Sequence, residues 1–227
     1  EYKSYAWRDE MVANSFAAFL AWQQEVKQCE RCPLAETRTQ VVINDLKANV
    51  WGNDDFDQEH WQGWQVFLLG EAPGGQEDQK GIPFCGQAGG ILNDFLSLAQ
   101  LERAEVYISN VVKCRPVKPS TRGKYGNYAN RKPKKAEQDA CRPWLEEEIR
   151  FVQPKLLVPL GNVPLSFVLG KTAAIGEYHG KYFWSDRLQV GVFPLYHPAA
   201  LIYDASKKAV YKQDVMALGA LCRQQLK

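Results

Sequence analysis

The sequence lacks any apolar run long enough to cross a membrane. It also lacks a charged start followed by an apolar stretch, the pattern that directs secretion. Its glycine-rich loop is not closed by Lys-Ser or Lys-Thr, because Gly81 is followed by Ile82 and Pro83, which excludes a phosphate loop of the nucleotide-triphosphate type. These absences predict a cytoplasmic protein with no membrane partner.

The composition is that of a globular chain. With 227 residues, 45% of them apolar and 24% charged, we expect one domain spanning 1–227 with a full core. The net charge of +2 says little about partners, so a nucleic-acid site must be argued from where the charges lie. Six cysteines without a secretion signal favour metal ligands or buried thiols over disulfides.

Four short apolar runs predict buried strands that alternate with helical segments. The runs are 66–69, 106–112, 155–161 and 191–196, and helices are expected at 1–28, 91–96, 164–169 and 211–226. This alternation predicts a three-layer α/β/α sandwich with a mostly parallel central sheet and helices on both faces.

The segment after the first run, residues 70–93, is the most informative stretch. It is rich in glycine and proline, and it carries the acids Glu71, Glu77 and Asp78 and the aromatic Phe84. Ligands of α/β sheets bind outside the carboxyl ends of the strands, where this loop is expected to lie. The alternative is a tight glycine-rich turn without a ligand.

Residues 70–92 resemble the first motif of the family 4 uracil-DNA glycosylases, the iron-sulfur branch of that superfamily. The family pattern is GEAPGxxEDxxGxPFxGxAGxLL, and this chain has GEAPGGQEDQKGIPFCGQAGGIL, departing only at Ile91. The resemblance implies a uracil-DNA glycosylase-like fold. It also implies hydrolysis of the N-glycosidic bond of uracil in DNA, which leaves an abasic site for base excision repair.

Two residues at strand ends are candidates for base recognition and catalysis. Asn110 follows the second run, and its amide can donate to O4 and accept from N3–H of uracil, whereas cytosine presents the opposite pattern. His197 lies in Tyr196–Leu201, which resembles the superfamily's HPxxL motif, and the resemblance implies a hydrogen bond to O2 of the departing base. A turn cap at Asn110 and a structural role for His197 are the alternatives.

The resemblance also assigns roles within the 70–93 loop. Phe84 is expected to stack on the base and Glu77 to exclude the thymine methyl group, while Gly70 and Ala72 complete the substrate site. Ala72 stands where family 1 enzymes have an aspartate, so Glu71 is the candidate to activate water. An equally open role for Glu71 is to hold the loop by hydrogen bonds to backbone amides.

Four of the six cysteines match the layout of the family's cluster ligands. Cys29 and Cys32 form a CxxC, Cys114 lies in NVVKCRP, and Cys141 lies in CRPWL. The resemblance implies a [4Fe-4S] cluster with a structural role. Spacing alone leaves a Cys₄ zinc site open, and the two remaining cysteines are expected to be ordinary packed thiols.

Between Lys113 and Lys135 there are nine basic residues and no acid. Interleaved tyrosines favour a loop that follows DNA phosphates, against the default of a solvated charge run. Residues 117–129 form an apparent insertion relative to family 4, and it contains no histidine, so the covalent histidine trap of a related branch is not expected. The predicted DNA contacts are Lys113, Arg115, Arg122, Lys124, Arg131, Lys132, Lys207 and, as a wedge, Leu201.

The expected partner is uracil-containing DNA, single- or double-stranded, bound by a monomer. One rival function is a non-catalytic or covalently capturing uracil-DNA binding protein. Another is a glycosylase for a different deaminated base, such as hypoxanthine.

Overall fold

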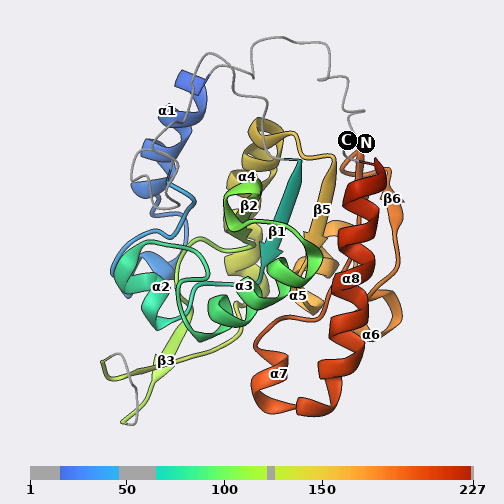
Figure 1. The fold of residues 1–227 in the computed structure, drawn as a ribbon. Helices are drawn as coiled ribbons and strands as arrows, with labels where there is room; N and C mark the ends of the chain where they lie inside the picture. The colour runs from blue at the N-terminus through green and yellow to red at the C-terminus, as the bar shows by residue number, and fades with distance from the viewer. Residues whose placement is uncertain (1–15, 46–64, 122–125, 226–227) are drawn as a thin grey trace.

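The computed structural model of the chain describes residues 16–45, 65–121 and 126–225 (Figure 1). Its centre is a five-stranded sheet in the order β2-β1-β5-β7-β6, in which neighbouring strands are parallel except for the antiparallel edge pair β6 and β7. The strands are β1 (Val66–Gly70), β2 (Val106–Asn110), β5 (Leu156–Pro159), β6 (Phe183–Ser185) and β7 (Val190–Val192).

Helices cover both faces of the sheet. On one face, Val66 and Leu68 of β1 pack with α3 (Gln87–Ala99) and α8 (Lys208–Gln225). On the other face, Phe67 and Leu69 pack with α1 (Phe16–Lys27), α4 (Lys135–Val152) and α5 (Asn162–Leu169). Successive strand residues point to opposite faces, so fully apolar strands require this double cover. The predicted three-layer sandwich is confirmed.

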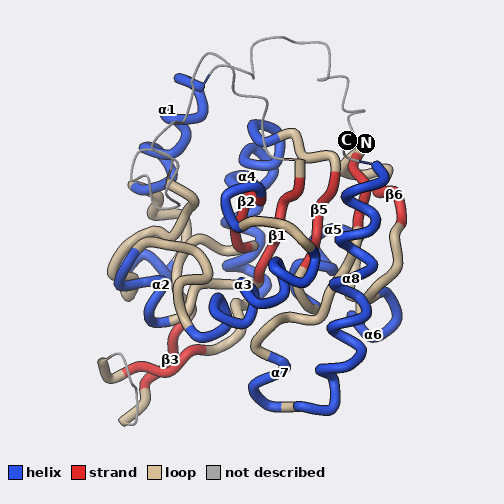
Figure 2. The backbone as a smooth tube through the Cα atoms, in the orientation of Figure 1, coloured by secondary structure: helices blue, strands red, loops and turns tan. Residues whose placement is uncertain are grey.

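The sequence prediction missed the long helix α4 and several short elements. Helix α2 (Gly75–Lys80) interrupts the 70–93 loop, and β6 adds an edge strand. The expected insertion begins and ends in an antiparallel hairpin, β3 (Val117–Pro119) with β4 (Tyr128–Asn130), which projects from the body of the molecule (Figure 2). The shorter helices are η2 (Pro33–Glu36), η3 (Arg103–Glu105), α6 (Ile175–Tyr178), α7 (Ala200–Tyr203) and η4 (Ala205–Lys207).

Two parts of the prediction lie outside the described residues: residues 1–15 of the segment expected to be helical at 1–28, and Arg122 and Lys124 of the insertion. Among the described helices, none has the length and apolar character needed to cross a membrane.

The packing of α3 on α8 depends on Gly219. A Cβ added there would lie 2.3 Å from the carbonyl oxygen of Ala99, a backbone atom that cannot rotate away. We expect Gly219→Ala to lower the free energy of unfolding by about 1–3 kcal/mol through overpacking, measured by chemical denaturation. The matched control is Gly90→Ala in α3, where a Cβ meets nothing within 4 Å. Equal stability of Gly219→Ala and the parent would contradict the expectation.

Candidate active site and four-cysteine site

A pocket lies beyond the carboxyl ends of the parallel strands and is called here the strand-end pocket. It brings together the predicted residues Glu71, Glu77, Phe84, Asn110 and His197, which come from three separate parts of the chain. The end of β4 and the two residues after it add further polar side chains to the lining of this pocket, namely Asn130, Arg131 and Lys132. The sequence reasoning did not place Asn130 in the site.

The parallel pairing of β1 and β2 sets Gly70 beside Asn110. A Cβ on Gly70 would lie 2.3 Å from Asn110 Oδ1 and 2.6 Å from Phe84 Cε2, so only glycine lets these two side chains approach the strand. Asn110 is 1% exposed, and its Oδ1 has no hydrogen-bond partner among the described residues. Because an unpaired buried acceptor is costly, this oxygen is well suited to a ligand that donates a hydrogen bond.

Phe84 is held in the left-handed backbone region, with φ of 51°. Such a conformation is uncommon for a bulky residue and needs support from its surroundings. Arg103 supplies it, because its Nη2 donates to the carbonyl oxygens of Pro83 at 2.8 Å and Phe84 at 2.9 Å. Burial lowers the pKa of Arg103 to about 10. Sequence reasoning missed Arg103 because it lies 19 residues further along the chain, outside every recognised motif.

His197 stacks on Phe84, with ring centroids 5.6 Å apart and an angle of 30° between the planes. Its Nδ1 lies 3.1 Å from the backbone N of Ala199 and accepts that hydrogen bond. Burial lowers the pKa of His197 to about 4, so the ring is neutral at pH 7. A neutral ring whose Nδ1 accepts must carry its proton on Nε2. His197 therefore has one N–H donor left for a ligand.

The two glutamates of the loop have different surroundings. Burial raises the pKa of Glu71, and the nearby Lys132 partly offsets the rise. Among the described residues no group donates a hydrogen bond to the Glu71 carboxylate, which is contrary to the loop-holding role. Glu77 has such a bond instead, because its Oε1 accepts from the backbone N–H of Gly86 at 2.8 Å.

The predicted DNA contacts have varied surroundings. Arg131 and Lys132 line the strand-end pocket, although Arg131 also forms a two-pronged ion pair with Glu137, at 2.8 and 2.6 Å. Arg115 is buried and donates to Asn130 Oδ1 at 2.7 Å. Lys207 pairs with Asp204, and Leu201 is partly buried against the core.

The prediction that Lys113 contacts DNA is wrong. Its side chain is 1% exposed, and its ammonium lies 2.5 Å from the equally buried carboxylate of Glu148. A lysine sealed in the interior by an ion pair cannot reach a phosphate.

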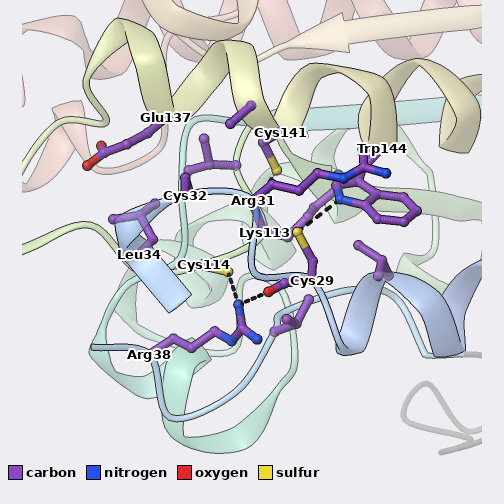
Figure 3. A pocket seen from close by; sticks show the side chains of 14 residues that line it. Cys29, Arg31, Cys32, Leu34, Arg38, Lys113, Cys114, Glu137, Cys141 and Trp144 are labelled. Atoms are coloured by element: carbon purple, nitrogen blue, oxygen red, sulfur yellow. Dashed lines mark hydrogen bonds between the residues drawn. The ribbon is translucent and has the colours of Figure 1, made fainter. Parts of the chain in front are cut away.

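The four predicted ligand cysteines, Cys29, Cys32, Cys114 and Cys141, line one cavity between the end of α1, the end of β2 and the start of α4 (Figure 3). They are called here the four-cysteine site. Three of the sulfurs accept a hydrogen bond: Cys29 from Trp144 Nε1 at 3.1 Å, Cys114 from Arg38 Nη1 at 3.6 Å, and Cys141 from the backbone N of Lys113 at 3.4 Å. Such donors stabilise negative charge on thiolate sulfur.

Burial raises the pKa of Cys114 to about 11 and that of Cys141 to about 12. These groups are thiols at pH 7 unless a metal displaces the proton, since thiolate is the metal-binding form. Within the described ranges, no group of three or more such side chains is arranged to hold a metal ion. Four cysteine sulfurs around one cavity, three of which accept hydrogen bonds, are nevertheless a donor set that fits a metal centre held by thiolates.

Asp78 joins the two sites. It is buried in α2, and its carboxylate accepts from the backbone N–H of Thr39 at 3.0 Å and from the Thr39 hydroxyl at 2.7 Å. Thr39 follows Arg38, whose guanidinium contacts Cys114 Sγ and the carbonyl oxygen of Cys29. The segment after the CxxC is thus fixed both to the four-cysteine site and to the wall of the strand-end pocket.

Known proteins with similar sequences include uracil-DNA glycosylases, which is consistent with the residues gathered in the strand-end pocket. Residues 62–218 match the model of the uracil DNA glycosylase superfamily. The chain is 35% identical to the type-4 uracil-DNA glycosylase of Thermotoga maritima, over 82% of this chain and 83% of the relative. It is 33% identical to that of Sulfurisphaera tokodaii, over 85% and 79%. A type-5 enzyme of Pyrobaculum aerophilum is 26% identical, over 80% and 83%. The chain belongs to the uracil DNA glycosylase superfamily and, within it, to the type-4 family.

Proposed function

We propose that this protein excises uracil from DNA by hydrolysing the N-glycosidic bond and leaving an abasic site. The observation that carries the proposal is the pair of groups in the strand-end pocket: the unpaired amide oxygen of Asn110 and the free N–H donor of neutral His197. Uracil presents the complementary groups, a donor at N3 and carbonyl oxygens at O2 and O4.

Recognition requires the base to leave the duplex, because its edge is otherwise paired and stacked. Phe84 lines the pocket, where the hydrogen bonds from Arg103 support its left-handed backbone, and its ring replaces part of the stacking that the base gives up. Asn110 Oδ1 accepts from uracil N3–H. Cytosine has an acceptor at N3, so its binding would leave two acceptors facing each other, and it is rejected.

Cleavage places negative charge on the departing base. A neutral His197 that donates to O2 stabilises this charge as it develops, and it needs no proton transfer to do so. The carboxylate of Glu71 faces the pocket without a bond to the loop, so it is available to orient a water toward C1′. The raised pKa of Glu71 strengthens it as a base.

We further propose that the four-cysteine site holds a [4Fe-4S] cluster through Cys29, Cys32, Cys114 and Cys141. The cluster would supply a structural cross-link between segments that are far apart in the sequence. The hydrogen bonds to three sulfurs support ligation by thiolates, and the choice of an iron-sulfur cluster over zinc rests on the match of the four cysteines to the type-4 family layout. Cysteine ligands must stay reduced, and the cytoplasm keeps thiols reduced, so we place the enzyme in the cytoplasm. We propose that it acts as a monomer with a single domain.

The test is incubation of the purified protein with end-labelled oligonucleotides that contain one uracil, hypoxanthine or thymine, single-stranded and paired. Alkali then cleaves abasic sites, and a denaturing gel resolves the products. We expect cleavage at uracil and a strong reduction of it in Asn110→Ala. Binding without cleavage, a covalent adduct, or cleavage only at hypoxanthine would each replace the proposal with the corresponding rival.

The hairpin is expected to bind phosphates of the bound DNA. Its two ends are adjacent, because the backbone N of Arg131 donates to the Pro116 carbonyl at 3.1 Å, so residues 117–129 can be deleted and the chain rejoined. Every phosphate that the shortened protein no longer neutralises reduces the slope of log K against log salt by about 0.9 on duplex DNA. We expect weaker binding with a flatter salt dependence, measured by fluorescence titration. An unchanged slope would rule out phosphate binding by the hairpin, and Lys155→Gln, at the opposite end of the sheet, is the control.

A further inference from the structure

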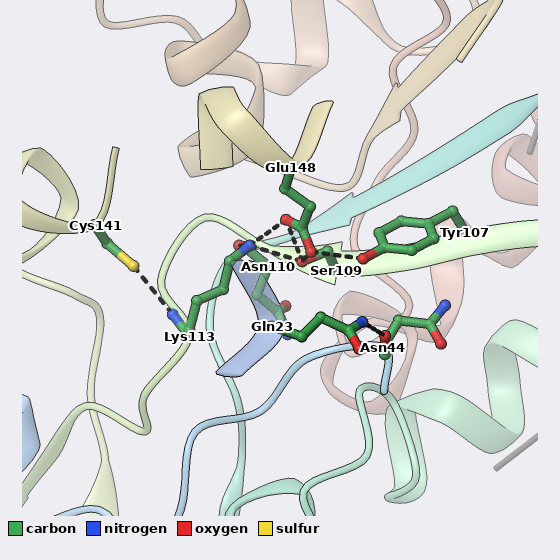
Figure 4. Close-up of polar contacts among 8 residues, drawn as sticks. All are labelled: Gln23, Asn44, Tyr107, Ser109, Asn110, Lys113, Cys141 and Glu148. Atoms are coloured by element: carbon green, nitrogen blue, oxygen red, sulfur yellow. Dashed lines mark hydrogen bonds and ion pairs between the residues drawn. The ribbon is translucent and has the colours of Figure 1, made fainter. Parts of the chain in front are cut away.

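Lys113 occupies an unusual position for a charged residue. Its side chain is 1% exposed and that of its partner Glu148 is 0% exposed. Figure 4 shows the polar contacts that surround the two charges. The lysine ammonium has three N–H donors, and each has an acceptor: Glu148 Oε2 at 2.5 Å, Ser109 Oγ at 2.7 Å and the carbonyl oxygen of Asn110 at 2.8 Å.

The carboxylate of Glu148 is equally well satisfied. The Tyr107 hydroxyl donates to it at 2.9 Å, and Ser109 Oγ lies within 3.0 Å of both carboxylate oxygens. Burying an ion pair gives little net stability, because desolvation offsets the attraction between the charges. The ion pair is therefore better explained by the neighbouring groups that it holds in place.

One of the groups it fixes is the backbone of the base-reading residue. Asn110 is the last residue of β2, and its carbonyl receives the lysine ammonium just where the strand ends. The amide side chain of the same residue projects into the strand-end pocket. A fixed carbonyl restricts rotation of the Asn110 backbone, and with it the direction of Oδ1.

The backbone of Lys113 belongs to the other site. Its N–H donates to Cys141 Sγ at 3.4 Å, its carbonyl accepts from Val42 N at 2.8 Å, and the next residue is Cys114. Lys113 therefore contacts the four-cysteine site through its backbone and the base-reading residue through its side chain.

We propose that Lys113 is a positioning residue: its ion pair with Glu148 aims the Asn110 amide at the base, and its backbone anchors that pair to the four-cysteine site. The proposal rests on the proposed function of the pocket. It assigns Lys113 no contact with DNA.

The test is a double-mutant cycle between Lys113→Met and Asn110→Ala. Single-turnover excision of uracil is measured at saturating enzyme, and binding is measured separately with DNA containing 2′-fluoro-deoxyuridine, which resists cleavage. Displacement of a catalytic group by about 1 Å can cost about 100-fold in rate, so we expect a reduction of that order in Lys113→Met. In the Asn110→Ala background the same change should cost almost nothing more, because the positioned group is absent.

A second variant guards against misfolding. Lys113→Met leaves Glu148 buried without its partner, which destabilises the protein, whereas Lys113→Met with Glu148→Leu removes both charges. The paired variant should regain its melting temperature and keep the visible absorbance of the parent, yet it should remain slow and lose its preference for the uracil analogue over thymine. Lys155→Met, the same substitution at the other end of the sheet, should match the parent in every assay.

Three results would overturn the proposal: full activity in the paired variant, additive effects in the cycle, or an unchanged preference for the uracil analogue. A parent that prefers the analogue but does not excise uracil would refute the catalytic function alone. The binding arm of the cycle would then still decide the role of Lys113.

Discussion

Replacement of His197 by phenylalanine is expected to slow uracil excision by about 10²–10³-fold, the usual cost of removing one donor from a developing oxyanion. Phenylalanine keeps a ring against Phe84 but has no N–H, so the reduction should appear in the single-turnover rate and not in DNA affinity. A rate within a few-fold of the parent would show that the donor at O2 comes from elsewhere in the pocket.

The low pKa of His197 gives the same residue a pH signature. Because its folded pKa is about 4, the ring stays neutral, and its donor intact, from about pH 5 upward. An ordinary histidine would titrate near pH 6.5, but we expect the pH dependence of the excision rate around this pH to be the same in the parent and in His197→Phe. The free energy of unfolding should depend on pH. Between pH 6.5 and 4 the histidine of the unfolded chain binds a proton, whereas the buried ring of the folded protein stays neutral. His197 therefore lowers the free energy of unfolding of the parent by up to about 3 kcal/mol as the pH falls. Denaturation of the parent and His197→Phe at pH 7 and 4.5 measures this difference.

Replacement of Cys141 by alanine is expected to abolish the visible absorbance of protein purified without air and to remove its iron. Cys141 lies in α4, while its partner cysteines follow α1 and β2, so a cluster would add a covalent cross-link to the packing and hydrogen bonds that already join these three segments. A destabilisation of several kcal/mol would lower the melting temperature by about 10 °C or more, since each kcal/mol moves the midpoint of such a chain by about 2–4 °C.

The matched control is Cys222→Ala. Cys222 is also buried, but it lies in the core between α8 and the sheet and not in the four-cysteine site. Its replacement should leave absorbance and iron content unchanged. Colourless parent protein containing one equivalent of zinc would contradict the cluster, whatever the variants show.

Most of the layers and the strand-end pocket could be predicted from sequence, because apolar runs are local signals and the 70–92 motif is long. Asn110 was found because it ends a strand, and His197 because its segment, which follows β7, resembles the superfamily's HPxxL motif. Arg103 and Asn130 were missed because nothing local marks them: one acts through two carbonyl oxygens distant in sequence, and the other through the return strand of the hairpin.

Lys113 was misassigned for a related reason. Within a run of nine basic residues, charge alone cannot distinguish a lysine facing solvent from one facing Glu148, which is 35 residues away. The turn after β2 decides the matter by directing the side chain back toward Ser109 and Asn110. Such a reversal is set by tertiary packing, which composition does not report.

The alternation of β2 has a consequence for how this chain tolerates insertions and deletions. Ser109 points to Glu148 and α4, while Asn110 points to the pocket, and the two differ by a single position. One residue gained or lost within Val106–Asn110 would move both side chains to the opposite faces of the sheet, so that the amide would point toward α4 and no longer into the pocket. Point substitutions in this strand can reduce base recognition to different degrees, but an insertion or deletion of one residue would abolish recognition by Asn110.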